Sequence, residues 1–313
     1  MEGRFMAISL NNLIYPYFVA RGISIKKEIK TFPGINRFSI DSLIRDLKVT
    51  IDLGLNKILL FGIPSQKDDS GVTAYQKDNI VALAIEKIKA AFPDLVVFAD
   101  VCLCAYTKHG HCGVLKEGKK EIDNKATLKA LSKIALSYAQ AGADWVAPSA
   151  MAKGQVLAIR GILDKHGYSG TKILGYSAKF NSNFYGPFRN ALNSSPKFGD
   201  RSAYQLDYRC VQKALEKIEE DIDSGADMVM VKPALSYLDI IREARQKFEF
   251  PLAAYNVSGE YALVKYGAKQ KLWEEKKVVK EIISSISRAG ADYIITYHAK
   301  DIARWIKKES YLI

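Results

Sequence analysis

Apolar residues occur along this chain in short runs that alternate with longer segments of helical periodicity. Four runs follow directly after a small residue–Gly–small or polar sequence, which is typical of the end of a helix followed by a strand. Three of these junctions read Gly-Ala-Asp, at 142–144, 225–227 and 290–292, and the fourth contains Gly54. The eight predicted strands comprise residues 13–19, 58–61, 95–101, 145–147, 172–177, 228–231, 251–257 and 293–297.

Helical periodicity links most of these strands, for example over residues 128–141 and 211–224. Eight alternating strands and helices in a chain of 313 residues predict a single parallel (β/α)8 barrel. A doubly wound open sheet is the alternative, because sequence alone does not show whether a sheet closes. No shift in composition marks a domain boundary.

Two longer segments interrupt the alternation, and each follows a predicted strand. Residues 182–207 are rich in Asn, Ser, Gly, Pro and aromatic residues, and residues 102–124 contain Cys, His and Gly. Long loops at the carboxyl ends of barrel strands carry the active site in this fold, and such loops are often lids. We therefore expect residues 182–207 to cover a site at this end.

Composition and charge are those of a soluble globular protein, with 48% hydrophobic and 26% charged residues. The net charge of +12 fits anionic small substrates, nucleic acid or an acidic membrane. Because the lysines are spread over many segments without a long basic run, a solvated basic surface is the simplest interpretation. No apolar run reaches membrane-spanning length, and no secretory signal begins the chain, which favours a cytoplasmic location.

Three clustered cysteines are the clearest chemical signal. Asp100, Cys102 and Cys104 alternate along the end of a predicted strand and should share one side, and Cys112 follows after a short turn. Three thiolates suit a zinc ion that keeps one open position, and His111 could be a ligand or support one. A disulfide or inert buried thiols are the alternatives, and Cys210 is more consistent with a structural role.

Two lysines end neighbouring predicted strands. Lys232 closes the apolar run 228–231 and precedes Pro233, which cannot continue a strand, and Lys179 ends the strand before it. Burial and a second nearby ammonium both lower the pKa of a lysine and make its amine nucleophilic. Lysines that merely mark where a strand reaches solvent are the alternative interpretation. Arg189 and Arg201, on the long loop, would suit substrate carboxylates.

Together these motifs resemble the porphobilinogen synthase (5-aminolaevulinate dehydratase) family, in its zinc-binding form. The resemblance runs from Asn12 to Tyr297. It rests on Asp-Val-Cys-Leu-Cys at 100–104, Tyr-Thr-Lys-His-Gly-His-Cys-Gly at 106–113, Tyr-Ser-Ala-Lys-Phe at 176–180, Phe-Tyr-Gly-Pro-Phe-Arg at 184–189, Met-Val-Met-Val-Lys-Pro-Ala at 228–234 and Val-Ser-Gly-Glu-Tyr at 257–261.

The resemblance implies the condensation of two 5-aminolaevulinate molecules to porphobilinogen, with loss of two waters, in tetrapyrrole (haem) biosynthesis. It implies a Schiff base on Lys232 for the first-bound substrate and one on Lys179 for the second, with Asp100 in proton transfer. Further implied site residues are Ser258 and Tyr297 for the first carboxylate, Arg189 and Arg201 for the second, Gln205 for substrate binding, and Cys102, Cys104 and Cys112 for catalytic zinc.

Several positions depart from the family pattern. The N-terminal arm is shortened to residues 1–12, before a catalytic barrel of residues 13–313, so a homo-oligomer is expected but an octamer is in doubt. Lys217 stands where many bacterial members have a glutamate for an allosteric magnesium, so we expect no such site. Lys153 replaces an aspartate and His298 replaces an aromatic residue.

Three hypotheses follow for the function. The first is the zinc-dependent synthase, acting on 5-aminolaevulinate without nucleic-acid or membrane partners. The second is a different Schiff-base barrel, such as a class I aldolase, in which zinc is structural. The third is a zinc-bearing protein that uses its positive charge to bind nucleic acid.

Overall fold

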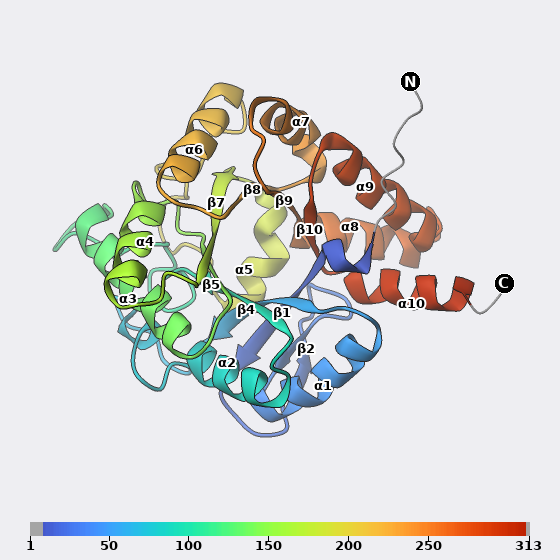
Figure 1. Cartoon of the computed structure of the whole chain (residues 1–313), viewed down its shortest axis with the longest axis horizontal. Coiled ribbons are helices and arrows are strands. Elements are labelled where there is room, and N and C mark those ends of the chain that lie inside the picture. Colours follow the sequence, from blue (N-terminus) through green and yellow to red (C-terminus); the bar gives the residue numbers. More distant parts are fainter. Residues whose placement is uncertain (1–8, 311–313) are drawn as a thin grey trace.

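Eight parallel strands close into a barrel in the computed structural model, which describes residues 9–310 (Figure 1). Each strand pairs in parallel with the next along the chain, and β1 pairs with β10 through Leu13–Ile294 and Ile14–Ile295. The predicted (β/α)8 barrel is therefore confirmed, and the open sheet is wrong. The barrel strands are β1 (Leu13–Ala20), β4 (Lys57–Ile63), β5 (Val96–Val101), β6 (Trp145–Pro148), β7 (Lys172–Lys179), β8 (Met228–Lys232), β9 (Leu252–Asn256) and β10 (Tyr293–Thr296).

The predicted strands all coincide with barrel strands, and the differences lie at their ends. β8 includes Lys232 and stops before Pro233, and β7 continues to Lys179 past a register shift between Gly175 and Ala178. β9 begins after Pro251. Proline has no N–H to donate, so Pro233 and Pro251 lie just outside these two strands, whereas β1 contains Pro16 and β6 ends on Pro148.

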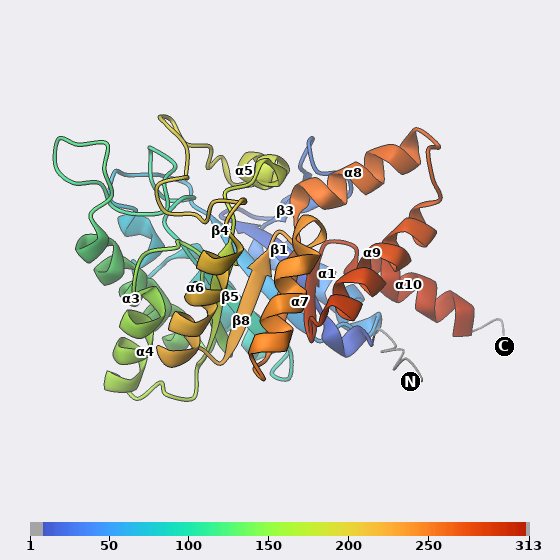
Figure 2. The same cartoon turned by 90° about the horizontal axis from the view of Figure 1, so that it is seen from above.

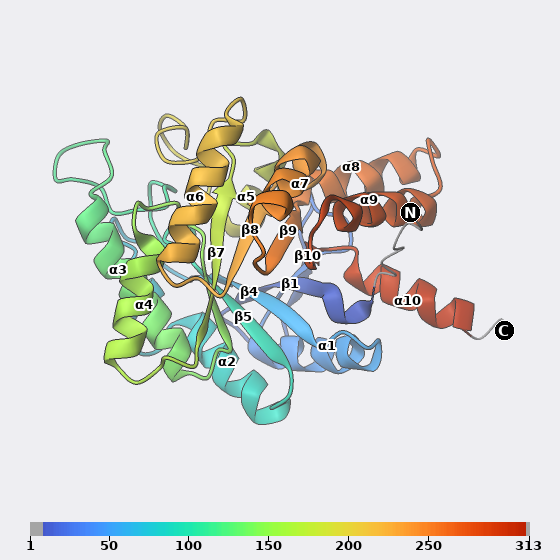
Figure 3. The same cartoon turned by 45° about the horizontal axis from the view of Figure 1, so that its top comes forward.

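Helices surround the barrel, and the long loops gather at one of its ends together with α5 and α8 (Figures 2 and 3). The helices are α1 (Ile40–Asp52), α2 (Ile80–Ala91), α3 (Asn124–Gln140), α4 (Gln155–Lys165), α5 (Gly186–Leu192), α6 (Val211–Asp223), α7 (Leu238–Lys247), α8 (Ser258–Lys269), α9 (Glu275–Ala289) and α10 (Ala299–Ser310). Within residues 9–310, no helix has the length and apolar character needed to cross a membrane. Of the expected arm, residues 1–8 lie outside the described residues, and Leu10–Asn12 form a short 3-10 helix.

Two features of the loops were not predicted. A hairpin of β2 (Lys26–Glu28) and β3 (Asn36–Phe38) follows β1 and pairs with it through β3. Its strands are only three residues long, and β2 is fully exposed, so they show no apolar alternation. The segment 182–207 is also less irregular than expected, because it contains α5 and the 3-10 turn Asn183–Tyr185.

The Gly-Ala-Asp junctions confirm the predicted helix stops and add a second role. Gly54, Gly142, Gly225 and Gly290 have φ between +90° and +128°, the left-handed region that favours glycine. At the start of β8, the Asp227 carboxylate accepts a 2.8 Å hydrogen bond from the backbone N–H of Ile173 in β7. Arg160 lies 3.8 Å from the same carboxylate and donates to the carbonyl of Thr171.

The same arrangement occurs twice more, so three carboxylates clamp successive strand pairs at the amino ends of the barrel strands. Asp144 accepts from Val97 N and pairs with Lys89, and Asp292 accepts from Leu252 N and pairs with Arg245. The junction at Gly54 has Asn56 in place of the aspartate, and its carbonyl accepts from Val96 N. The three aspartates therefore have a structural role, remote from the long loops.

Replacing Asp227 with alanine should destabilise the barrel. The change leaves the Ile173 N–H without its carboxylate partner, and a lost hydrogen bond of this kind costs about 1–2 kcal/mol. We expect the midpoint of thermal unfolding, measured by circular dichroism, to fall by about 2–6 °C. Asp164→Ala is the matched control, because Asp164 also pairs with Arg160 but is half-exposed and lies on a helix. Equal shifts in the two variants would contradict the clamp.

Candidate active site and metal centre

Two buried lysines lie side by side where β7 and β8 end. Lys179 and Lys232 are register partners in the parallel ladder, so their side chains leave neighbouring strands at the same level. Their exposed fractions are 6% and 4%. The structure thus places the two predicted lysines together inside the barrel mouth, rather than at a solvated strand end.

Aromatic rings surround the Lys232 ammonium group. Its Nζ lies 3.9 Å from the ring centre of Tyr255, 5.1 Å from that of Tyr176 and 5.2 Å from that of Phe188. Burial, reinforced by the charge of Lys179, lowers the pKa of Lys232 well below its ordinary value. A neutral amine has a free lone pair, so Lys232 is suited to attack a carbonyl carbon.

Lys179 has a more polar environment. Its Nζ donates a 2.5 Å hydrogen bond to the carbonyl of Ser149, at the end of β6. Asp100, in β5, is close enough for its pKa to respond to Lys179: burial raises that pKa to about 6, and the lysine partly offsets the rise. One carboxylate oxygen of Asp100 has no hydrogen-bond partner among the described residues. Asp100 can therefore exchange a proton near neutral pH.

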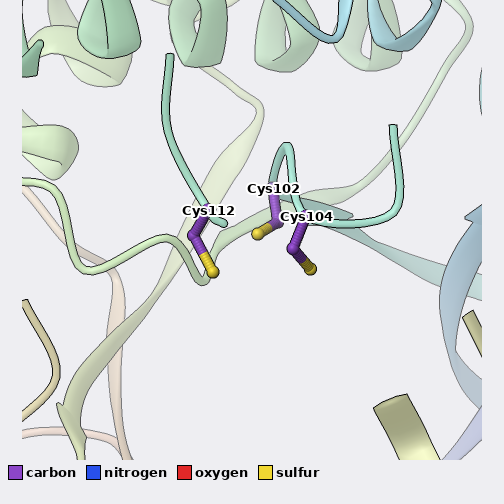
Figure 4. Close-up of side chains that lie close together, drawn as sticks. All are labelled: Cys102, Cys104 and Cys112. Carbon is purple, nitrogen blue, oxygen red and sulfur yellow. The ribbon is translucent and has the colours of Figure 1, made fainter. Parts of the chain in front are cut away.

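The three clustered cysteines converge, although by a different local route from the one expected. β5 ends at Val101, so Cys102 and Cys104 lie in the turn that follows and not on an extended strand. The backbone N–H groups of Tyr106 and Thr107 both bond to the carbonyl of Leu103 and close this turn. The three Sγ atoms lie within 4.8 Å of one another, and all three side chains are buried (Figure 4).

The cluster of three thiols suits a metal ion that prefers sulfur ligands. All three cysteines are free, which removes the disulfide as an interpretation of this structure. The neighbouring thiols of Cys102 and Cys104 lower the pKa of Cys112 well below its ordinary value. Since a thiolate is the ligand form of cysteine, the group could hold a metal ion with three sulfur donors.

His111 contacts the loop 182–207 through both ring nitrogens. Nδ1 lies 3.1 Å from the hydroxyl of Tyr204, and Nε2 lies 3.0 Å from the carbonyl of Phe198. The imidazole thus links the cysteine loop to the segment expected to be a lid. Cys210 precedes α6 and is half-buried, away from the three-thiol group.

The predicted arginines hold the backbone of the same lid. Arg201 is 3% exposed and donates to the carbonyls of Gly110 (3.0 Å) and Ser194 (2.8 Å). Arg189 makes a longer contact, 3.4 Å, with the carbonyl of Ser182. The amide of Gln205 is buried, and neither of its polar atoms has a partner among the described residues. Each arginine also has an unpartnered Nε, so all three side chains retain capacity to bind a polar ligand.

Ser258 and Tyr297 complete the set of predicted site residues. The Ser258 hydroxyl accepts from Phe188 N and donates to the carbonyl of Phe184, both at 3.1 Å, so it fastens the lid to α8. The Tyr297 hydroxyl lies 2.9 Å from that of Tyr255, whose ring contacts Lys232. Lys232, Ser258 and Tyr297 are therefore connected through shared neighbours.

Several residues of the site were missed by sequence reasoning. Tyr176, Tyr185 and Tyr255 are fully buried around Lys232, and Glu260 and Asn256 form a buried polar pair nearby. The sequence offered one usable signal for these residues. Glu260 lies three residues past the end of a predicted apolar strand, and a glutamate is rarely buried without a specific partner.

The structure also shows what surrounds the three residues that depart from the family pattern. Lys217 pairs with the buried carboxylate of Asp221 at 2.6 Å. Lys153 is exposed and lines a cavity of about 690 Å³ that also reaches Cys112. His298 is fully buried against Tyr261, and burial lowers its pKa to about 3, so it is neutral.

A second group of possible metal ligands consists of Glu275, His298 and Asp301. The Lys265 ammonium pairs with both carboxylates, at 2.5 and 2.7 Å. Because an internal cation already neutralises these carboxylates, the group has less use for a metal ion than the three thiols have.

Fold and site together define a (β/α)8 barrel whose mouth carries paired lysines, a titratable aspartate and three thiols that could hold a metal ion. The model of the family described as delta-aminolevulinic acid dehydratase matches residues 4–305. The chain belongs to this family and is an enzyme of it.

Relatives with that name span most of the chain. The dehydratase of Bacillus subtilis is 48% identical over 95% of this chain and 91% of its own length, and that of Archaeoglobus fulgidus is 50% identical over the same shares. The crystal structure of the Toxoplasma gondii dehydratase (porphobilinogen synthase), solved with the product porphobilinogen, is similar with a TM-score of 0.94. It is 41% identical over 96% of this chain and 86% of that chain.

Replacing Gly259 with alanine should prevent the lid from closing against α8. An added Cβ would lie 2.5 Å from the carbonyl oxygen of Phe184, which is backbone and cannot rotate away. We expect trypsin to cut at least tenfold faster within residues 182–207, as followed by mass spectrometry. Gly161→Ala is the control, since a Cβ there meets nothing within 4 Å. Unchanged cleavage in Gly259→Ala would show that this contact does not hold the lid.

Proposed function

We propose that this enzyme condenses two 5-aminolaevulinate molecules to porphobilinogen through imines on Lys232 and Lys179. The observation that carries the proposal is the register pairing of two buried lysines at the ends of β7 and β8, in a chain of this family. Of the three hypotheses drawn from the sequence, family membership favours the synthase. The same membership supports our inference that the enzyme works in the cytoplasm as a homo-oligomer.

Imine formation accounts for the stoichiometry. Each lysine amine attacks the ketone carbon of one substrate, a C=N bond replaces C=O, and one water leaves. Two imines release the two waters of the overall reaction. Both C–N bonds to lysine must break again as the substrates join, so the product leaves with neither lysine modified. An imine is readily protonated to an iminium, which draws electrons from the adjacent carbon and eases loss of a proton there.

The environments of the two lysines support different roles. Lys232 lies among aromatic rings and close to Ser258 and Tyr297, which we infer to hold the carboxylate of the first substrate. Lys179 is close enough to Asp100 and Cys112 for their pKa values to respond to it, and we assign Arg189, Arg201 and Gln205 to the second substrate. Asp100, with a pKa of about 6, is suited to take or return protons between the two.

Zinc is the metal we assign to Cys102, Cys104 and Cys112. Zinc accepts three sulfur ligands and keeps a fourth position open in catalytic sites, and when bound it supplies a Lewis acid beside the second substrate. At the position where many bacterial family members have a magnesium ligand, Lys217 already provides a cation for Asp221. We therefore infer that this enzyme needs no allosteric magnesium at that position.

Borohydride should trap 5-aminolaevulinate on Lys232 and Lys179, because it reduces an imine to a stable amine. We expect Lys232→Met and Lys179→Met each to lower porphobilinogen formation at least a thousandfold, measured colorimetrically. Lys172→Met is the control, since Lys172 begins the same strand as Lys179 but is exposed at the opposite end. Wild-type protein that forms no product and is labelled at neither lysine would overturn the proposed function.

Removing zinc with a chelator should abolish porphobilinogen formation, and added zinc should restore it. Cys112→Ser should lose the bound zinc equivalent measured by atomic absorption, because serine is a poor ligand for this ion. Cys210→Ser should keep it, because Cys210 lies outside the three-thiol group. Full activity after complete zinc removal would refute this part of the proposal.

A further inference from the structure

A buried glutamate connects the ends of two strands that carry the first substrate's residues. Glu260 is 1% exposed. Its Oε1 accepts a 2.8 Å hydrogen bond from Leu235 N, three residues past Lys232. Its Oε2 accepts from Val257 N at 2.7 Å, directly before Ser258, and from the side chain of Asn256 at 3.1 Å.

The connection continues to the third strand. The hydroxyl of Thr296 donates to Oδ1 of Asn256 at 2.9 Å. The same hydroxyl accepts from His298 N at 3.2 Å. Asn256, Thr296 and His298 have no exposed surface. The buried chain of hydrogen bonds thus runs from the end of β8 through that of β9 to that of β10, and we call Glu260, Asn256 and Thr296 the rim network.

The rim network joins three strand ends, and each of them lies next to a residue assigned to the first substrate. Lys232 ends β8, Ser258 follows Val257, and Tyr297 lies between Thr296 and His298. The bonds of the network include none to β7 or to the loop 182–207, which carry the residues assigned to the second substrate. The network therefore acts directly on the residues assigned to the first substrate.

Helix capping explains only part of this arrangement. Glu260 caps the start of α8 by accepting from Val257 N, as is common for a glutamate at this position. Capping requires neither the bond to Leu235 N nor the bond to Asn256. Burying a carboxylate is costly unless several donors stabilise it, and burial raises the pKa of Glu260 to about 7. A cap alone could be provided by an exposed side chain at lower cost.

We propose that the rim network is the positioning device for the first substrate: Glu260, with Asn256 and Thr296, fixes the spacing of Lys232, Ser258 and Tyr297. The inference rests on the proposed function. The carboxylate of Glu260 ties the backbone beyond Lys232 to the start of α8, and Thr296 ties both to the backbone that flanks Tyr297. The substrate's ketone then reaches Lys232 while its carboxylate reaches Ser258 and Tyr297.

Partition of a limiting substrate between the two lysines tests this inference. Protein is mixed with one equivalent of 5-aminolaevulinate, reduced with borohydride and digested, and the labelled Lys232 and Lys179 peptides are compared by mass spectrometry. Wild-type protein should be labelled mainly on Lys232. In Glu260→Gln and Thr296→Val the ratio of Lys232 to Lys179 label should fall at least tenfold. Because both peptides come from the same folded molecules, a loss of stability alone does not move the ratio.

Two controls separate positioning from general damage. Thr296→Ser keeps the hydroxyl and should keep the wild-type ratio. Asp292→Asn makes the same carboxylate-to-amide change at the other end of β9 and β10, and should also keep it. Unchanged ratios in both Glu260→Gln and Thr296→Val would overturn the inference while leaving the proposed function intact. Label on neither lysine of the wild-type protein would overturn both.

Discussion

Two buried amines held side by side in the barrel mouth form the constraint on which the rest of the site depends. Parallel register fixes Lys179 and Lys232 at the same level, and both are almost fully buried. Burial and the neighbouring charge of Lys179 hold the pKa of Lys232 well below its ordinary value. Around them lie groups that can carry negative charge, namely Asp100 and the thiols, and beyond these the buried guanidinium of Arg201. Because groups that can carry opposite charges lie next to one another, many ionisable groups can be buried together beneath one lid.

The lid is held by bonds within itself and by groups beneath it. Arg201 and Ser258 bond to lid carbonyls, and His111 joins the cysteine loop to Tyr204 and Phe198. Arginine and serine can offer a carboxylate the same donors that they offer these carbonyls.

The alternation of apolar runs and helix stops was sufficient to predict the barrel, because each strand is buried on both faces and each stop needs a glycine. It also placed Lys179 and Lys232 together, since strands that are neighbours in sequence are neighbours in this fold. The hairpin β2–β3 escaped prediction because its stability comes from pairing with β1 and not from its own side chains. Cys102 and Cys104 were predicted to converge through strand alternation, but a turn brings them together. The bond between Glu260 and Leu235 joins two chain segments 25 positions apart, and no local pattern contains that information.

The aspartate clamps at the amino ends of the strands have a consequence for how the barrel folds. The clamps join residues 40 to 54 positions apart, whereas the bond from Asn12 to the carbonyl of Asp292 spans 280 positions. Closing a longer loop costs more chain entropy, so two-strand units can form early while the seam between β1 and β10 forms late. Before that seam closes, β1 and β10 are both open edges to which a strand of another chain could add. The seam is thus where folding and misassembly of this enzyme compete.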